Sequence, residues 1–328
     1  MKLSLVLPVY DEAPVLPELY RRLRAALEGL PAEWEVIFVD DGSTDGSWAG
    51  VRALALEDER VRGVRLSRNF GHQIALTAGL EVAEGDAVVT MDSDLQHPPE
   101  TIPALVRQGA KGFDVVYAIR GASDAESWFK VRSAAVFYWL LNKLTSLSLP
   151  HGGADFRYMS RRAVNAVLAM PERNRFLRGM TRWVGFEQTA IEYVGDARAT
   201  GQAKYTFRRM LHFALDAIAG FSAIPLRLAS VLGFLVSGLG FVYLLYVLAI
   251  HVAGKAIPGW TSVTVAVLLL GGVQLICLGI VGQYLGRMYD ETKQRPLFFV
   301  ADDTRDGDRH ASVARLLTSR IDDLDAGR

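Results

Sequence analysis

Short apolar runs alternate with longer amphipathic segments over the first 120 residues of the chain. Runs rich in aliphatic side chains predict strands at residues 3–9, 35–39, 61–66, 87–91 and 115–119. Apolar residues at helical spacing predict helices at residues 14–27, 47–57, 73–82 and 100–108. Pro14 and Pro99 stand where the first turn of a helix tolerates proline. The alternation predicts an α/β fold with a mostly parallel, Rossmann-like sheet covered by helices.

Beyond Arg120 the regular alternation ends. Residues up to 205 mix aromatic segments with glycine-rich turns, and we assign them to the same domain, residues 1–205. In residues 206–227 arginines are interleaved with apolar side chains, which is typical of amphipathic juxtamembrane helices. Residues 228–250 and 261–286 contain no charged residue, and each is long enough to cross a bilayer as a helix. The sequence therefore predicts a folded domain followed by a two-helix transmembrane hairpin.

Charged residues around the two apolar stretches predict their orientation. The short connection between the stretches has Lys255 as its basic residue, whereas several basic residues flank the opposite ends. These are Arg208, Arg209, Arg227, Arg287, Lys293 and Arg295. Because basic flanks stay in the cytoplasm, we expect a multi-pass protein of the cytoplasmic (inner) membrane, with its folded domain and both termini cytoplasmic. Residues 287–328 are then a cytoplasmic tail, which we expect to be mobile beyond about residue 302.

Composition and charge exclude several classes of protein. The 36 basic residues balance 36 acidic residues, so no overall charge favours a nucleic acid, and we expect no nucleic-acid partner. Cys277 is the single cysteine, which excludes a disulfide within the chain and a thiol-rich zinc site. The apolar run near the N-terminus is too short for a secretory signal.

Acidic side chains follow the strand predicted at residues 87–91. Asp92 and Asp94 are separated by one residue, and Gln96 continues the same spacing. Alternate side chains of an extended segment share a face, so these residues could offer oxygen ligands to one hard divalent cation. Such a cation can neutralise the charge on a departing diphosphate. An isolated Asp-x-Asp pattern is also typical of a capped turn, but its place at a strand end, beside two other acidic loops, favours metal binding.

Two further acidic loops follow the first and second predicted strands. The loop that begins with Asp40 and Asp41 must cap the next helix, yet two adjacent acids exceed what a cap needs. A carboxylate at a strand end can accept hydrogen bonds from a base or a ribose hydroxyl, so we interpret both aspartates as nucleoside contacts. Tyr10, Asp11 and Glu12 would complete the same nucleoside-binding surface, although Glu12 also suits the start of the following helix.

Five short motifs occur in a characteristic order. They are LPVYDE at residues 7–12, VDDGSTD at 39–45, RNFGHQ at 68–73, MDSDLQHPPE at 91–100 and ADFR at 154–157. As a set they resemble the family 2 glycosyltransferases. The chain is most similar to the polyprenyl-phosphate glycosyltransferase group, which includes dolichol-phosphate mannose synthase and the bacterial enzymes that load glucose or aminoarabinose onto undecaprenyl phosphate. The resemblance covers about residues 1–300, including both apolar stretches.

The resemblance implies a GT-A fold and an inverting transfer of one sugar, glucose first among the candidates, from a UDP-sugar to a polyprenyl phosphate with Mg2+ or Mn2+. The metal and diphosphate ligands it implies are Asp92, Asp94 and Gln96. The nucleotide pocket it implies is formed by Pro8, Tyr10, Glu12, Asp40, Asp41 and Asp92. Asp155 would lie beside the sugar and, with Asp94, is the catalytic candidate. The residues expected to receive the lipid phosphate are Arg120, Arg132, Arg198 and Lys204.

The expected chemistry agrees with these residue types. A lipid monophosphate is already an anionic nucleophile, so it needs positioning and charge screening more than deprotonation. Arginine suits that task because its planar fork matches phosphate oxygens. Asp155 is therefore expected to contact a sugar hydroxyl or to orient the acceptor rather than to remove a proton. Two departures from the family pattern are Asp11, where Asn is usual, and Ala203, where Ser is usual.

Alternative functions remain open at the level of sequence. The acceptor could be another lipid, such as a diacylglycerol or a ceramide, or the chain could be a non-catalytic membrane scaffold that binds nucleotide sugars. The intact acidic set argues against the scaffold. His72 and His97 flank motif residues, and without a neighbouring Cys or His at ligand spacing we expect polar loop roles for them. Glycines and Gln274 and Gln283 in the apolar stretches would allow a homo-oligomer.

Overall fold

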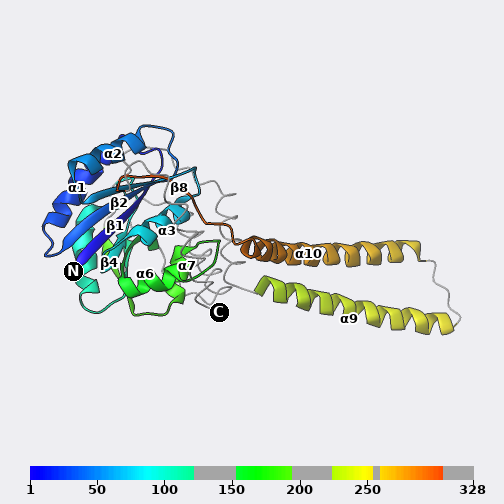
Figure 1. The fold of residues 1–328 in the computed structure, drawn as a ribbon. Coiled ribbons are helices and arrows are strands. Elements are labelled where there is room, and N and C mark those ends of the chain that lie inside the picture. The colour runs from blue at the N-terminus through cyan, green and yellow to red at the C-terminus, as the bar shows by residue number, and fades with distance from the viewer. Residues whose placement is uncertain (122–152, 194–223, 254–258, 306–328) are drawn as a thin grey trace, which may run out of the picture. The chain divides into compact units, whose positions relative to one another are not determined.

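A computed structural model describes residues 1–121, 153–193, 224–253 and 259–305 of the chain. The described residues belong to two compact units, a sheet domain and a pair of long helices. In the sheet domain, strands and helices alternate along the chain (Figure 1). The elements up to Arg120 are β1 (Lys2–Val9), α1 (Leu16–Glu28), β2 (Glu33–Asp40), α2 (Ser47–Glu57), β3 (Val61–Leu66), α3 (His72–Val82), β4 (Ala87–Thr90), the 3-10 turn η1 (Pro99–Thr101), α4 (Ile102–Gly109) and β5 (Val115–Arg120).

These elements agree with the hydrophobic pattern of the sequence. Each strand predicted before residue 121 is present, and its ends lie within two residues of the predicted ones. The irregular part of the sequence adds β6 (Gly153–Ser160), α6 (Arg161–Leu168), α7 (Leu177–Trp183) and β7 (Gln188–Tyr193). The prolines within the first two positions of α1 and α4 are Pro17 and Pro103, where the missing N–H costs no hydrogen bond. Pro14 precedes α1, and Pro99 opens the 3-10 turn η1 instead of a longer helix.

The described strands form one eight-stranded sheet in the order β7-β5-β6-β4-β1-β2-β3-β8, where β8 is Val300–Asp303. The four central strands β4, β1, β2 and β3 are parallel. β6 runs antiparallel between β4 and β5, so the sheet is mixed but mostly parallel, as predicted. Because β4, β1 and β2 are parallel neighbours, their carboxyl ends meet at one edge, which is where ligands gather in open α/β sheets.

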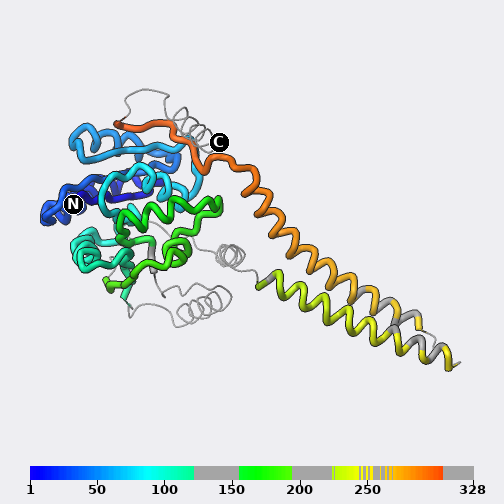
Figure 2. The backbone as a smooth tube through the Cα atoms, turned by 60° about the horizontal axis from the view of Figure 1, so that its bottom comes forward, coloured from blue at the N-terminus to red at the C-terminus, as the bar shows by residue number. Residues whose placement is uncertain are grey.

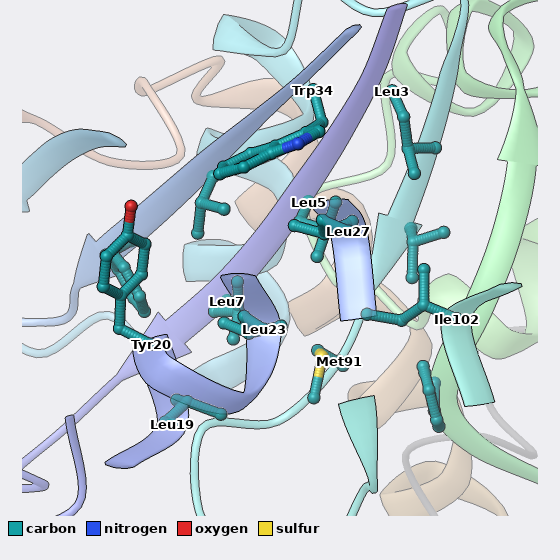
Figure 3. Close-up of a cluster of buried hydrophobic side chains, with 14 of the residues drawn as sticks. Leu3, Leu5, Leu7, Leu19, Tyr20, Leu23, Leu27, Trp34, Met91 and Ile102 are labelled. Carbon is teal, nitrogen blue, oxygen red and sulfur yellow. The ribbon is translucent and has the colours of Figure 1, made fainter. Parts of the chain in front are cut away.

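Side chains of β1 alternate between two apolar layers. Leu3, Leu5 and Leu7 are fully buried against α1, where Leu23 and Leu27 are also fully buried (Figure 3). Each buried leucine contributes roughly 1.5–3 kcal/mol relative to an exposed one. On the other face, α3 packs against β1 and β2. The two layers fix the positions of the ends of β1, β2 and β4 relative to one another.

The chain after the second long helix returns to the sheet, which the sequence pattern did not predict. β8 pairs antiparallel with β3, and Figure 2 shows this orange segment along the edge of the sheet domain. Arg62 and Asp303 form a mostly buried ion pair across the two strands, with 2.7 Å between Nη2 and Oδ2. Gly63 N donates to Thr304 Oγ1 over 2.9 Å. The expected tail, residues 287–328, therefore contains the last residues of α10 (Trp260–Thr292) and an ordered strand. Residues 306–328 lie outside the described residues.

The second unit contains α9 (Ile224–Val252) and α10 (Trp260–Thr292), which lie side by side (Figure 1). Both helices are long and apolar enough to cross a membrane, with the most apolar windows at Leu226–Tyr243 and Leu269–Thr292. Most of their described apolar side chains are exposed, as expected for a lipid-facing surface. Cys277 Sγ lies 3.4 Å from the Ala229 carbonyl oxygen of the neighbouring helix.

Candidate functional site

Three loops meet at the carboxyl ends of β4, β1 and β2. Ser93, in the loop after β4, donates a hydrogen bond through Oγ to the Pro8 carbonyl oxygen over 2.8 Å. Asp41 N, just after β2, donates to the Val9 carbonyl oxygen over 2.9 Å. Pro8 itself is buried, so its part in the site is to anchor the β4 loop rather than to present a side chain. The structure thus brings together the acidic loops that the sequence analysis singled out.

The loop after β4 presents its acidic residues on one side. Asp92, Asp94 and Gln96 are partly exposed, whereas the intervening Ser93 and Leu95 are buried, so the predicted alternation is present. Gln96 N donates to Asp94 Oδ1 over 3.1 Å, and its side-chain amide donates to Asp94 Oδ2. These bonds hold the Asp94 carboxylate against the loop.

Asp92 is oriented by two histidines. Its backbone N donates to His97 Nδ1 over 3.0 Å, and the buried His97 ring stacks on Phe156 with 5.1 Å between centroids. The polar loop role expected for His97 is confirmed. Asp92 Oδ1 is buried and accepts no hydrogen bond, while His72 Nε2 lies 3.3 Å away. The Asp92 side chain as a whole remains about one third exposed (34%), so it can still meet a ligand.

The oxygen atoms of this loop fit a cation that shares its coordination with a substrate. Within the described ranges, no group of three or more His, Cys, Asp and Glu side chains is placed to hold a metal ion by itself. Mg2+ is commonly bound by one or two carboxylates together with substrate phosphates, and needs no such cage. Asp92 Oδ1, which accepts no hydrogen bond, and the nearby Asp94 carboxylate have the required chemistry.

Asp40 and Asp41 are buried and bonded to protein groups. Asp40 Oδ1 accepts from Ser43 N over 3.2 Å, and Asp40 Oδ2 lies 3.2 Å from Nε of Arg65. Asp41 accepts from the backbone N–H groups of Phe70 and Gly71 over 2.7 and 2.9 Å. Burial raises the pKa of Asp41, although both N–H groups oppose the change. These carboxylates therefore shape the surrounding loops.

The loop after β1 is fastened to the loop after β2. Asp11 has a φ of 55°, a left-handed conformation that Asp and Asn adopt more readily than most residues, so either residue suits this position. Asp11 Oδ1 accepts from Thr44 N over 2.9 Å, and Glu12 N donates to Ser47 Oγ over 2.9 Å. Tyr10 between these anchors is 48% exposed, so its ring is available to stack on a ligand.

Asp155 lies on β6, near the loop after β4, and is surrounded by hydrogen-bond donors. Gln73 Nε2 donates to Asp155 Oδ2 over 3.0 Å, and Arg178 donates from Nε to Oδ1 and from Nη2 to Oδ2 over 3.2 and 3.1 Å. Arg157 Nη2 donates to Oδ1, and His72 Nε2 lies 3.4 Å from Oδ2. His72 therefore stands between Asp155 and Asp92 and joins Asp155 to the loop after β4.

These neighbours set the protonation of the cluster. Burial alone would raise the pKa of Asp155, but Arg178, His72 and Arg157 together hold it well below the usual range. Burial likewise opposes protonation of His72, yet its hydrogen bond with Asp155 and the charge of Asp92 raise its pKa. A carboxylate that accepts from several donors and stays ionised is a poor proton acceptor. The arrangement agrees with the expectation that Asp155 orients groups rather than removes a proton.

His72, Gln73 and Arg178 were not predicted as site residues. His72 and Gln73 end the RNFGHQ motif, whose recurrence in the family pattern was the available signal. Arg178 lies on α7 and has no motif of its own in the sequence analysis. Its place beside Asp155 is a tertiary contact between segments 23 residues apart.

The residues expected to receive the lipid phosphate are described in part. Arg120 ends β5, is exposed, and pairs in register with Tyr193 of β7. The other candidates, Arg132, Arg198 and Lys204, lie outside the described residues.

Comparison with known proteins places two parts of the chain in described families. Residues 4–168 match the family model Glycosyl transferase family 2, and residues 224–288 match the model GtrB C-terminal hairpin. The first match covers β1 to α6 and therefore the carboxylates described above. The second covers most of α9 and α10.

Similar full-length proteins include an uncharacterized glycosyltransferase of Bacillus subtilis (strain 168), YkcC, which is 45% identical over 298 residues, 90% of this chain and 92% of that protein. The bactoprenol glucosyl transferase of Shigella phage SfV is 38% identical over 304 residues, 92% of this chain and 99% of that protein. Among solved structures, mannosyl-3-phosphoglycerate synthase from Rubrobacter xylanophilus is 17% identical, with a TM-score of 0.47 over 67% of this chain and 73% of that chain.

Proposed function

The chain belongs to glycosyl transferase family 2, and we propose that it transfers one sugar, glucose in the simplest case, from a UDP-sugar to undecaprenyl phosphate or a related polyprenyl phosphate. One observation carries the proposal. The partly exposed Asp92 and Asp94 lie at the carboxyl edge of the sheet, and His72 joins Asp92 to the buried, ionised Asp155. A site of this kind can hold a charged leaving group on one side and organise the sugar on the other.

The lipid acceptor is supported by the second half of the chain. A relative that matches over 92% of this chain is named bactoprenol glucosyl transferase, and the helical pair matches a hairpin family. Helices α9 and α10 expose apolar side chains over a length that spans a bilayer. We infer from the basic flanks that residues 1–205, the juxtamembrane segment 206–227 and the tail 287–328 lie on the cytoplasmic side.

The donor side of the site would be formed by the loops after β1, β2 and β4. Asp92, Asp94 and Gln96 would hold Mg2+ or Mn2+, which would neutralise charge on the diphosphate as it leaves. Tyr10 and Glu12 would line the nucleoside side of this pocket. Pro8, Asp40 and Asp41 would act there by holding the loops in place, because their described contacts are with protein groups.

The acceptor needs no base in this scheme. A monoester phosphate is anionic near neutral pH, and an attack from the side opposite the diphosphate gives inversion at the sugar carbon. The described site agrees with that requirement, because Arg178, His72 and Arg157 lower the pKa of Asp155 and make its carboxylate a weak proton acceptor. Arg120, Arg132, Arg198 and Lys204 would screen and position the lipid phosphate. Self-association through the helical pair would be compatible with this arrangement.

Membranes that contain the full chain test the proposal. We expect sugar to appear in the lipid fraction when a panel of radiolabelled UDP-sugars, with GDP-mannose as a control donor, is supplied with undecaprenyl phosphate. Parallel reactions with a diacylglycerol and with a ceramide separate the lipid alternatives, since these offer a neutral hydroxyl. Donor binding without transfer to any of these lipids would contradict the proposal and favour a scaffold.

A further inference from the structure

The loop after β4 is curled back on itself. Its side chains alternate between interior and solvent, with Ser93, Leu95 and His97 buried and Asp92, Asp94 and Gln96 partly exposed. Alternation alone would also arise in an extended strand, but residues 92 and 97 of such a strand would be about 16 Å apart. Here the Asp92 N–H donates to His97 Nδ1 over 3.0 Å, so the two ends of the loop meet.

Leu95 is the residue of this loop with a left-handed backbone. Its φ is 62°, and the other non-glycine residues with positive φ in the described part of the chain are Asp11 and Gln294. A short polar side chain such as that of aspartate tolerates this conformation, because it can hydrogen-bond to the nearby backbone. Leucine has no such compensation, and its Cβ crowds the following carbonyl oxygen. The loop therefore contains a strained residue between Asp94 and Gln96.

Burial of the side chain explains why the strained backbone of Leu95 persists. The residue is 8% exposed and belongs to the apolar core of the sheet domain. Ser93 and His97 anchor the loop on either side of it through the hydrogen bonds described above. A glycine would adopt the same φ without strain, but it would have no side chain to bury. Strain that the surroundings maintain in this way is characteristic of functional sites.

The turn at Leu95 determines where the oxygen atoms of the loop lie. The backbone N–H and the side-chain amide of Gln96 both donate to the Asp94 carboxylate, and these bonds close over Leu95. A change in φ at Leu95 would therefore move Gln96 relative to Asp94. Asp92 is held at the start of the curl by its bond to His97 at the end. The backbone of Leu95 thus sets the spacing of the three partly exposed side chains.

We propose that Leu95 is a positioning residue for the divalent cation. Its buried side chain holds the left-handed turn, and the turn places the oxygen atoms of Asp92, Asp94 and Gln96 around one ion. The inference rests on the proposed function, which assigns those three residues to the metal of the donor. A site that is arranged in advance loses less entropy when its ligand arrives. Leu95 itself contacts neither the metal nor a substrate in this scheme.

The test compares Leu95→Ile and Leu95→Met with wild type, using the full chain in detergent. Isoleucine is an isomer of leucine, but its branched Cβ opposes a positive φ, whereas methionine is unbranched at Cβ. Leu105→Ile is the matched control, because Leu105 is fully buried in the same apolar core but lies on the helix α4. The electron paramagnetic resonance signal of free Mn2+ measures Mn2+ affinity in the presence of UDP, and thermal melting reports folding.

We expect Leu95→Ile to weaken Mn2+ binding about tenfold or more and Leu95→Met to stay within about threefold of wild type. Leu105→Ile should leave the affinity unchanged even where it lowers the melting temperature. A lower melting temperature in Leu95→Ile with Mn2+ affinity within about twofold of wild type would show a merely structural role and overturn the inference. Equal losses of affinity in Leu95→Ile and Leu105→Ile would do the same.

Should Leu95→Ile fail to fold, Leu95→Gly decides, since glycine accepts the backbone conformation but removes the buried anchor. Mn2+ binding about tenfold weaker than wild type supports the inference, and wild-type affinity overturns it.

Metal binding does not need turnover, so failure of the inference and failure of the proposed function are distinguishable. A wild-type protein that binds Mn2+ with UDP but transfers no sugar would contradict the proposed function and leave the comparison at Leu95 intact. A wild-type protein that transfers sugar but binds no Mn2+ would overturn the inference.

Discussion

The carboxylate of Asp155 and the guanidinium of Arg157 form an ion pair that is almost completely removed from solvent. A buried pair of this kind is costly to assemble, and removal of one partner leaves the other charge without compensation. Burial lowers the pKa of Arg157 although Asp155 opposes the change, which reflects how much the cation depends on its partner. Two predictions concern this pair.

Replacement of Asp155 by Asn should destabilise the protein by about 3–5 kcal/mol, because Arg157 then remains buried without its counter-charge. Denaturant unfolding of the full chain in detergent, followed at an aromatic signal of the sheet domain, measures the change. Asp86→Asn serves as the control, since Asp86 is exposed and its contacts lie at the surface. That control should cost less than about 1 kcal/mol. A loss for Asp155→Asn no larger than the control's would show that Arg157 finds another partner.

The stability supplied by Asp155 should depend on pH in the acid range. Its pKa is lowered in the folded state, so the folded protein binds fewer protons here than the unfolded chain near and below the usual aspartate value of about 3.9. The contribution is therefore complete at neutral pH, begins to be lost as pH falls past about 4, and disappears below the folded-state pKa. The gap in melting temperature between wild type and Asp155→Asn should widen as pH falls through the range in which His72 gains its proton, because Asp155 raises the pKa of His72, and it should shrink below pH 4. A gap that does not shrink below pH 4 would contradict the assignment.

The sequence predicted the central part of the fold because the central strands are buried on both faces. Val36, Ile37, Phe38 and Val39 of β2 are all fully buried and read as one continuous apolar run. β8 was missed for the opposite reason. Its residues, VADD, resemble a solvated tail, and the strand forms by pairing with β3 and through the ion pair of Asp303 with Arg62, 241 residues apart in sequence.

In the candidate site too, residues identified by a local sequence pattern were predicted, and residues brought together by tertiary contacts were not. Asp92, Asp94 and Gln96 were predicted because their spacing along one strand end is local and visible in the sequence. The partners of Asp155 were not, since Gln73 and Arg178 meet it from α3 and α7, and nothing local distinguishes Arg178 from a solvated surface arginine. The buried contacts of Asp40 and Asp41 were missed similarly, because the acidic loop shows how many carboxylates are present but not which N–H groups they meet.

Replacement of Asp94 by Ala should reduce the rate of sugar transfer at least about a hundredfold. Membrane insertion and the melting temperature should change little. Asp94 is partly exposed and accepts hydrogen bonds from Gln96 of its own loop, so its loss should not disturb the core. Calorimetric titration of Mn2+ in the presence of UDP gives a readout that does not depend on turnover, and the variant should bind the ion at least tenfold more weakly. Undiminished transfer by wild type after chelation of divalent ions would rule out this use of Asp94.

Replacement of Gly63 by Ala should loosen the edge of the sheet at β8. A Cβ at this position would lie 2.6 Å from Val51 Cγ1 and 3.0 Å from both Thr304 Cγ2 and Trp48 Cζ3, so α2 or the chain after β8 must move. Overpacking of this kind costs about 1–3 kcal/mol. Gly29→Ala is the control, because a Cβ at the end of α1 meets nothing closer than 4.0 Å. Faster amide exchange at Thr304, whose N–H donates to the Gly63 carbonyl oxygen over 3.0 Å, should accompany the loss of stability in the Gly63 variant. Unchanged exchange at Thr304 together with wild-type stability would show that the chain after β8 does not depend on the space left by this glycine.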